Sequence, residues 1–283
     1  MKQPQFLSPP QTIRVVAPAA KLEFSDKDAS YWHDRGYTLD LPNLDNPWHY
    51  LSGTDRDRFN DFAAGWANYG ALLCGRGGYG TMRLLHWLNQ LGEGSPWVIG
   101  FSDITALLWA LCTQQEIMSI HAPVLFTCAQ TNPEALDQLF DLLEGKIKYQ
   151  TIGGTAWRGG RAEGRLLAGN LTVATHLLGT PYIPAWEDII LALEDVGEPP
   201  YKIDRMLTQW HLSGYLVRVK GIALGSFGTD PLLDQILQER LDTLAVPIVA
   251  GLPFGHSPAN YPLVLGARCL LDGDRATLTW FLD

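Results

Sequence analysis

The 283-residue chain has few basic residues, few cysteines and no long apolar run. Because 21 Lys+Arg stand against 30 Asp+Glu, the formal net charge is −9, and a nucleic-acid partner, which would need a basic face, is not expected. No C-x-x-C pair and no H-E-x-x-H motif occurs, so neither a disulfide framework nor a metal site is predicted. The four separated cysteines are expected to be free thiols: Cys74, Cys112, Cys128 and Cys269.

Signals for a membrane or for export are also missing. No uninterrupted apolar stretch reaches the ~18 residues that a membrane-spanning helix requires, and the first ten residues lack the apolar segment of a secretory signal. We therefore expect a cytoplasmic protein without a membrane partner. Hydrophobic residues make up 46% of the chain and charged residues 18%, which is typical of a globular protein with a large core.

Short apolar segments alternate with helical ones along the chain, and this alternation predicts an α/β fold with a parallel sheet. The predicted strands of the first half include residues 12–18, 71–74 and 97–100. The Gly-rich residues 146–165 are typical of an interdomain linker or crossover. We predict an N-terminal nucleophile domain over residues 1–145 and a second α/β or α+β domain over residues 166–283, with the active site between them. The tail at 269–282 is predicted to form a hairpin.

A glycine-dense turn follows the predicted strand 71–74. Gly75, Gly77 and Gly80 satisfy G-x-G-x-x-G, so a nicotinamide-dinucleotide-binding protein is one interpretation. That fingerprint normally follows the first strand of its unit, whereas two strand–helix units precede this turn. The backbone amides of a glycine turn also suit an oxyanion hole, and a simple tight turn is the third interpretation.

Ser102 lies between the predicted strand 97–100 and an apolar helix. With Gly100 two residues before it, this segment has the pattern of a nucleophile elbow, in which a sharp turn exposes the hydroxyl group. Ile104 stands where G-x-S-x-G has its second glycine, which argues against an ordinary α/β-hydrolase. A helix cap formed by Ser102 or Asp103 is the structural alternative.

A serine nucleophile needs a base and a carboxylate that orients the base. Among the seven histidines, His256 differs because it lies in a loop rich in Gly and Pro after the predicted strand 248–250. Glu194 directly follows the apolar run 189–193, and the carboxyl end of a buried strand is where α/β sheets place their ligand sites. An ion pair or a helix cap is the alternative role for an acid at this place.

Four segments in this order resemble the serine LD-carboxypeptidases, the muramoyltetrapeptide carboxypeptidase family that also includes microcin C immunity proteins. The segments are residues 76–80 (RGGYG), 100–105 (GFSDIT), 193–196 (LEDV) with 201–207 (YKIDRML), and 255–256 (GH). The resemblance implies a Ser-His-Glu triad of Ser102, His256 and Glu194. It also implies an oxyanion hole from the backbone amides of Asp103 and a glycine of the turn, Gly78 by preference.

The resemblance further implies release of terminal D-alanine from murein tetrapeptide during cell-wall recycling, without a cofactor and by a homodimer. Hydrolysis of a microcin C-type peptidyl-adenylate is the alternative within the family. Arg76, next to the glycine turn, is a candidate for binding the terminal carboxylate of the substrate. Outside the family, the alternatives are the dinucleotide-binding protein and a catalytically silent sugar- or peptide-binding module.

Overall fold

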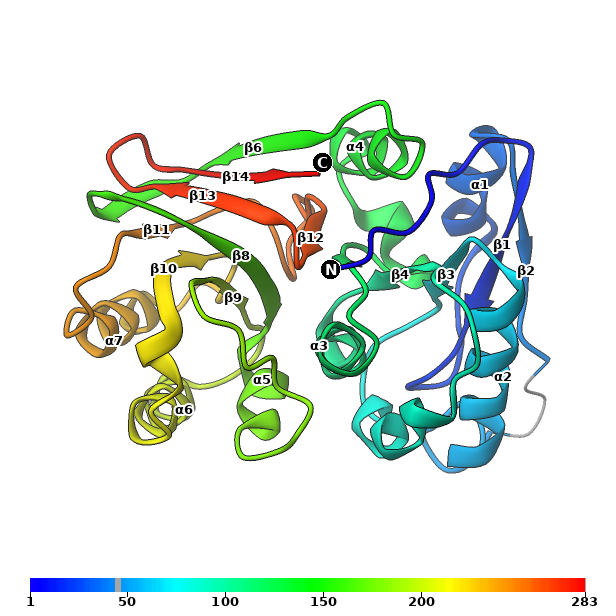
Figure 1. Cartoon of the computed structure of the whole chain (residues 1–283), viewed down its shortest axis with the longest axis horizontal. Helices are drawn as coiled ribbons and strands as arrows, with labels where there is room; N and C mark the ends of the chain where they lie inside the picture. Colours follow the sequence, from blue (N-terminus) through cyan, green and yellow to red (C-terminus); the bar gives the residue numbers. More distant parts are fainter. Residues whose placement is uncertain (44–46, 283) are drawn as a thin grey trace.

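The computed structural model describes residues 1–43 and 47–282, which form two β-sheets side by side with helices around them (Figure 1). The first sheet has the strand order β12-β5-β4-β3-β1-β2. Its strands are β1 (Gln11–Val16), β2 (Tyr37–Asp40), β3 (Ala71–Cys74), β4 (Trp97–Gly100), β5 (Ser119–His121) and β12 (Leu263–Leu265). Strands β1 to β5 are parallel, and only β12 runs antiparallel to its neighbour β5. The predicted parallel sheet is confirmed.

Helices connect the parallel strands, as crossovers between such strands require, and the last two helices of this half follow β5 and lead to the second sheet. They are α1 (Asp26–Asp34), α2 (Asp55–Asn68), the 3₁₀ helix η1 (Thr81–Gln90), the single turn η2 (Ser102–Ile104), α3 (Thr105–Gln114), η3 (Leu125–Gln130) and α4 (Pro133–Leu143). Local sequence sets where they begin. Ser25 forms a capping box at the start of α1, and Thr54 forms one at the start of α2. Pro133 begins α4, where its missing N–H costs no hydrogen bond.

The second sheet is mixed and has the order β6-β14-β13-β8-β9-β10-β11-β7. Its strands are β6 (Tyr149–Gly153), β7 (Thr155–Arg158), β8 (Arg161–Asn170), β9 (Ile189–Glu194), β10 (Val219–Leu224), β11 (Ile248–Ala250), β13 (Arg268–Asp272) and β14 (Thr277–Phe281). Strands β8 to β11 are parallel, and the other four are antiparallel to their neighbours. The helices of this half are α5 (Leu171–Leu177), α6 (Pro200–Leu212), η4 (Tyr215–Arg218) and α7 (Pro231–Leu241).

Residues 146–165, predicted as a linker, are folded into the second sheet. They contain β6, β7 and the first half of β8. The glycines of this segment supply the turns between short strands; Gly160, for example, has φ +100 between β7 and β8. The predicted hairpin at 269–282 corresponds to β13 and β14. Strand β12 was not predicted, and it places three residues of the C-terminal half in the first sheet.

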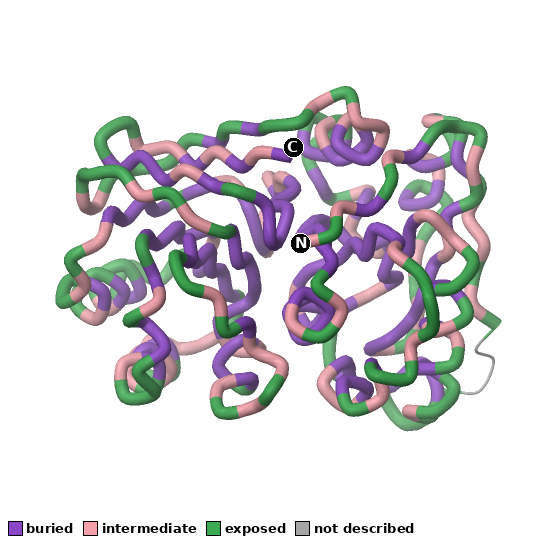
Figure 2. The backbone as a smooth tube through the Cα atoms, viewed as in Figure 1, coloured by how far each residue is buried: buried purple, intermediate pink, exposed green. Residues whose placement is uncertain are grey.

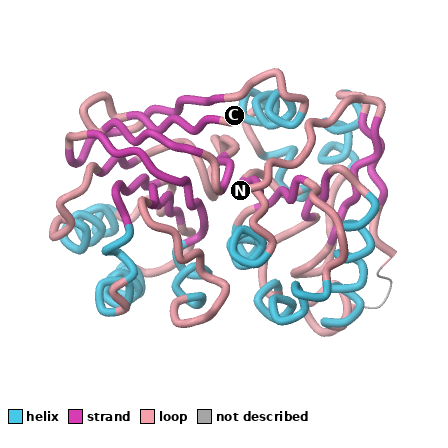
Figure 3. Tube along the Cα trace, viewed as in Figure 1, coloured by secondary structure: helices cyan, strands magenta, loops and turns pink. Residues whose placement is uncertain are grey.

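The two halves share a continuous core in which helix α3 is central. Every residue from Thr105 to Cys112 is buried, and the indole of Trp109 donates a hydrogen bond of 2.8 Å to the carbonyl of Ala168 in β8. Burial follows the strands of both halves, and the helices have exposed outer faces (Figures 2 and 3). Among the described residues, no helix is long and apolar enough to cross a membrane.

Candidate active site

Ser102 lies at a sharp turn between β4 and α3. Its φ is +62, in the left-handed region, which a non-glycine residue adopts at a cost of about 1 kcal/mol or more. A Cβ atom at Gly100 would lie 2.9 Å from Ile104 and 3.1 Å from Cys74. The close packing of these side chains against the turn therefore requires glycine at position 100. This is the strained strand-to-helix geometry of a nucleophile elbow, and the residue is partly exposed. The Ser102 hydroxyl makes no hydrogen bond to another described residue.

Glu194 and His256 are directly bonded. Glu194 is the last residue of β9 and its side chain is fully buried, and its Oε2 accepts a hydrogen bond from His256 Nδ1 at 2.6 Å and another from the His256 amide at 3.2 Å. Because a carboxylate only accepts, the proton of a neutral imidazole lies on Nδ1, and Nε2 keeps its lone pair. The pair therefore has the chemistry of a base with its orienting acid.

Asn170 fixes the other oxygen of Glu194. The two residues pair in register at the carboxyl ends of β8 and β9, and Asn170 Nδ2 donates to Glu194 Oε1 at 3.3 Å. The backbone N–H of Asn170 in turn donates a hydrogen bond of 2.9 Å to Thr105 Oγ1 of α3. Through Asn170, the carboxylate is thus tied to the helix that follows Ser102.

Phe101 connects the serine turn with the histidine loop. This residue directly precedes Ser102, and its ring centroid lies 4.7 Å from that of His256. The structure therefore places the β4 turn that carries Ser102 next to the bonded pair of Glu194 and His256. Next to His256 is a cavity of about 250 Å³, lined by Phe101, Thr127, Gln130, Thr131, Gly255, His256, Ser257, Pro258 and Asn260.

Gly255 lets the histidine loop pass close to the acid. Its φ is +97, and a Cβ atom there would lie 2.6 Å from Glu194 Cβ and 2.7 Å from Oε2. The Gly255 amide donates to Asn260 Oδ1 at 2.9 Å, which closes the loop. The residue before His256 therefore has to be glycine for both its conformation and its space.

We expect Gly255→Ala to lower the rate of active-site labelling by a fluorophosphonate at least tenfold and to destabilise the fold by about 1–3 kcal/mol. The reason is that the new methyl group displaces the Glu194 carboxylate from His256. Gly251→Ala in the same loop is the matched control, since Gly251 also has a positive φ, +64, but open space around its Cβ position. Equal labelling rates for the two variants would contradict this interpretation of Gly255.

In the glycine turn, Gly77 lies against Ser102. A Cβ atom at Gly77 would lie 3.0 Å from Ser102 Cβ, 3.2 Å from its Oγ and 3.6 Å from the Asp103 nitrogen. At Gly78, φ is +101 and the Cβ position faces Ala20 at 2.9 Å. The amide nitrogen of Gly78 belongs to the peptide unit that joins these two glycines, so the turn places that unit next to Ser102.

The dinucleotide interpretation of Gly75, Gly77 and Gly80 finds less support in the geometry. The turn leads into a 3₁₀ helix, and the first amide of this helix, that of Thr81, donates to the carboxylate of Asp103 at 2.9 Å. A pyrophosphate would need free amides at this helix start.

Arg76 is already engaged within the protein. Its guanidinium bonds to Glu23 at 2.6 Å and lies 4.6 Å from the centroid of the Phe126 ring. About a third of the side chain is exposed, so it is accessible next to the glycine turn. A substrate carboxylate at Arg76 would compete with Glu23.

His121 is a buried histidine whose place at the site the sequence did not predict. It ends β5, its ring lies 5.9 Å from the rings of both Phe101 and Phe254, and neither ring nitrogen has a partner among the described residues. Burial lowers the pKa of His121 to about 4, partly opposed by the charge of Glu194. The ring is therefore neutral at neutral pH.

This burial predicts an acid-dependent loss of stability. The unfolded chain takes up a proton at His121 below pH 6.5, and the folded chain does so only below about pH 4, so the free energy of unfolding falls as the pH drops through that window. We expect His121→Phe to remove on the order of 2–3 kcal/mol of this loss, measured by urea unfolding at pH 7, 5.5 and 4. The exposed His33, changed to Gln, is the control. An unchanged pH slope in His121→Phe would refute the prediction.

Asn170 and the buried Asp195 are further polar residues that motif reasoning did not assign to the site. Asp195 accepts hydrogen bonds of 2.8 Å from the amide and the hydroxyl of Thr172, and burial raises its pKa. Asn170 Nδ2 lies 3.3 Å from Asp195 as well as from Glu194. The signal in the sequence is their common place at the ends of neighbouring strands, which becomes readable only once the pairing of β8 with β9 is known.

Comparison with known proteins gives a consistent result over both halves. Residues 13–122 match the LD-carboxypeptidase N-terminal domain, and residues 163–271 match the LD-carboxypeptidase C-terminal domain. A Synechocystis sp. relative, whose carboxypeptidase name is an unproven assignment, is 42% identical over 98% of this chain and 97% of its own. The murein tetrapeptide carboxypeptidase of Pseudomonas aeruginosa is 31% identical over 95% of this chain and 94% of its own.

A solved structure agrees with these sequence matches. The crystal structure of muramoyltetrapeptide carboxypeptidase from Oxalobacter formigenes has a TM-score of 0.84 to this chain at 28% identity, covering 96% of this chain and 99% of that one. Both sheets and the connections between them are therefore shared. The chain belongs to the LD-carboxypeptidase family.

Proposed function

We propose that the protein is a serine carboxypeptidase that releases terminal D-alanine from murein tetrapeptide by cleaving the L–D peptide bond. The observation that carries this proposal is the hydrogen bond between Glu194 and His256, with the imidazole held against the residue that precedes Ser102. The names of the Pseudomonas and Oxalobacter relatives support the substrate class.

The proposed reaction is acyl transfer through a Ser-His-Glu triad. His256 Nε2 takes the proton of Ser102 as its Oγ attacks the scissile carbonyl carbon, and Glu194 stabilises the resulting imidazolium. The tetrahedral intermediate collapses when the C–N bond breaks, and His256 gives the proton to the departing amine of D-alanine. Water, deprotonated by His256, then hydrolyses the ester and frees Ser102.

The backbone amides of Asp103 and Gly78 are the proposed oxyanion donors. The close approach of Gly77 to Ser102 and to the Asp103 nitrogen supports this assignment, because both amides then border the space in front of Oγ. The cavity of about 250 Å³ beside His256 is of a size to receive the D-alanine leaving group, and its Thr127, Gln130 and Thr131 offer polar contacts. Arg76 is the proposed cation for a substrate carboxylate.

The direct test is digestion of murein tetrapeptide by the purified protein, with the products separated by liquid chromatography and identified by mass. We expect equal amounts of D-alanine and tripeptide, and much slower release from a tetrapeptide that ends in L-alanine. Parallel incubations contain an aminoacyl-adenylate analogue and NADH. Hydrolysis of the adenylate without D-alanine release would favour the microcin branch of the family, and NADH binding without fluorophosphonate labelling would favour a dinucleotide-binding protein.

A further inference from the structure

A buried arginine, Arg58 of α2, lies behind the two turns of the candidate active site. Its side chain has no exposed surface, and burial lowers its pKa, opposed by the neighbouring Asp55. Burying a charged side chain costs free energy of folding, and well-positioned hydrogen-bond partners offset this cost. The partners of Arg58 therefore indicate what the residue holds in place.

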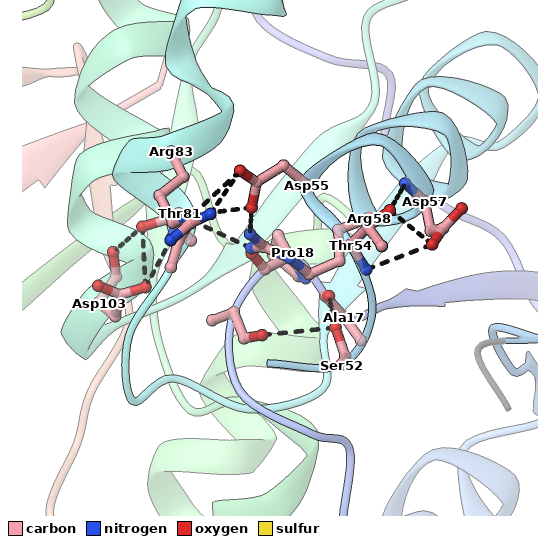
Figure 4. Close-up of polar contacts among 12 residues, drawn as sticks. Ala17, Pro18, Ser52, Thr54, Asp55, Asp57, Arg58, Thr81, Arg83 and Asp103 are labelled. Carbon is pink, nitrogen blue, oxygen red and sulfur yellow. Dashed lines mark hydrogen bonds and ion pairs between the residues drawn. The ribbon is translucent and has the colours of Figure 1, made fainter. Parts of the chain in front are cut away.

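Arg58 joins the end of the β1 segment to the end of the glycine turn (Figure 4). Its Nη1 donates to the carbonyl oxygens of Pro18 and of Gly80, the latter at 3.0 Å, and its Nη2 donates to Asp55 at 2.5 Å. Asp55 is in turn held by Arg83 at 2.8 Å. A Cβ atom at Gly80 would lie 2.9 Å from Arg58 Nη1, so the glycine turn and the guanidinium are fitted to each other.

The next residue along the chain continues this connection to the nucleophile. Thr81 is fully buried; its amide donates to Asp103 Oδ2 at 2.9 Å, and its hydroxyl lies 2.9 Å from the same oxygen and within hydrogen-bond distance of the Asp103 carbonyl. Asp103 directly follows Ser102, and its own amide is a proposed oxyanion donor. An unbroken set of contacts thus runs from Arg58 through Gly80 and the adjoining Thr81 to Asp103. Figure 4 shows the contacts of Thr81 with Asp103.

We propose that Arg58 is a positioning residue that sets the distance between the two oxyanion-binding amides, one on the glycine turn and one on the serine turn. The inference rests on the proposed function, because it assigns Arg58 to the stabilisation of a tetrahedral intermediate. Such donors act on the transition state far more than on the bound substrate, and displacement by less than 1 Å weakens them strongly.

The test compares Arg58→Met with Arg14→Met. Arg14 is the matched control because it is also largely buried and bridges two carboxylates, Asp40 and Asp61, and no bond ties it to the glycine turn. For Arg58→Met we expect kcat for D-alanine release to fall about 10- to 100-fold with KM changed less than about threefold. Labelling of Ser102 by a fluorophosphonate is expected to slow by a similar factor. For Arg14→Met we expect a lower Tm with unchanged kcat and labelling.

The outcomes separate the inference from the proposed function. If Arg58→Met lowers Tm but leaves kcat and the labelling rate unchanged, Arg58 is only structural and the inference is wrong. If Arg58→Met does not fold, kcat for D-alanine release and the rate of labelling are measured for Arg58→Lys and Thr81→Val instead. Unchanged kcat and labelling rates in both of these variants overturn the inference. If the native protein is labelled but releases no D-alanine, the proposed substrate is wrong, and slower labelling of the Arg58 variant still supports the positioning role. Absence of any labelling overturns both.

Discussion

Ser102→Ala is expected to reduce D-alanine release by about 10⁴-fold or more in kcat, because no covalent intermediate can form without Oγ. The φ of +62 at this position disfavours alanine as it disfavours serine, so the free energy of unfolding should change by less than about 1 kcal/mol. Steady-state kinetics on murein tetrapeptide measure the loss, and circular dichroism with thermal unfolding verifies the fold.

Covalent labelling provides the control for this substitution. A fluorophosphonate that modifies the native protein should leave Ser102→Ala unmodified, with intact-mass spectrometry as the readout. Ser257→Ala is a matched variant, since Ser257 lies directly after His256 and, within the described part of the chain, its hydroxyl bonds only to the carbonyl of Ala259, at 3.3 Å. Ser257→Ala should be labelled like the native protein. Residual labelling of Ser102→Ala would place the nucleophile elsewhere.

Glu194→Gln is expected to lower kcat by about 10³- to 10⁴-fold while leaving KM within a few fold. The side chain keeps its volume and its bond from Asn170, but the carboxylate that holds the Nδ1 proton of His256 is lost. An amide nitrogen directed at Nδ1 would favour the wrong tautomer and remove the lone pair from Nε2.

Asp195→Asn is the control for Glu194→Gln. It shows how much of the loss in kcat comes from removing any buried carboxylate and how much comes from removing the one that bonds to His256. Asp195 is the next residue, is equally enclosed and bonds to Thr172 rather than to His256. We expect Asp195→Asn to lower stability more than kcat. If Glu194→Gln retained most of the native kcat, Glu194 would have no role as the orienting acid.

The residues of the proposed triad could be singled out from the sequence because each has a local signature. Ser102 follows Gly100 at a strand-to-helix boundary, Glu194 ends an apolar run, and His256 follows a glycine that the loop requires. Each signature depends on neighbouring residues alone. The parallel sheet of the first half was predictable for the same reason, from the alternation of short apolar segments with helices.

What supports those side chains could not be predicted, because it depends on pairing between distant segments. Asn170 reaches Glu194 only through the register of β8 with β9, and Arg58 reaches the glycine turn only after α2 has packed across the first sheet. The strands within residues 146–165 could not be predicted for a related reason. The glycines of this segment predicted an interdomain linker, whereas pairing with the distant strand β14 makes residues 149–153 a strand.

Strand β12 has a consequence for how substrate reaches the catalytic groups. The loop with His256 leaves the second sheet at Ala250 and enters the first sheet at Leu263, where β12 pairs with His121, Ile120 and Ser119 of β5. The loop that carries His256 is thus anchored in both sheets, and a hinge opening between the halves would break the pairing of β12 with β5. Under the proposed function, we therefore expect the entry and exit of peptides to depend on side chains around the site rather than on a hinge opening between the halves.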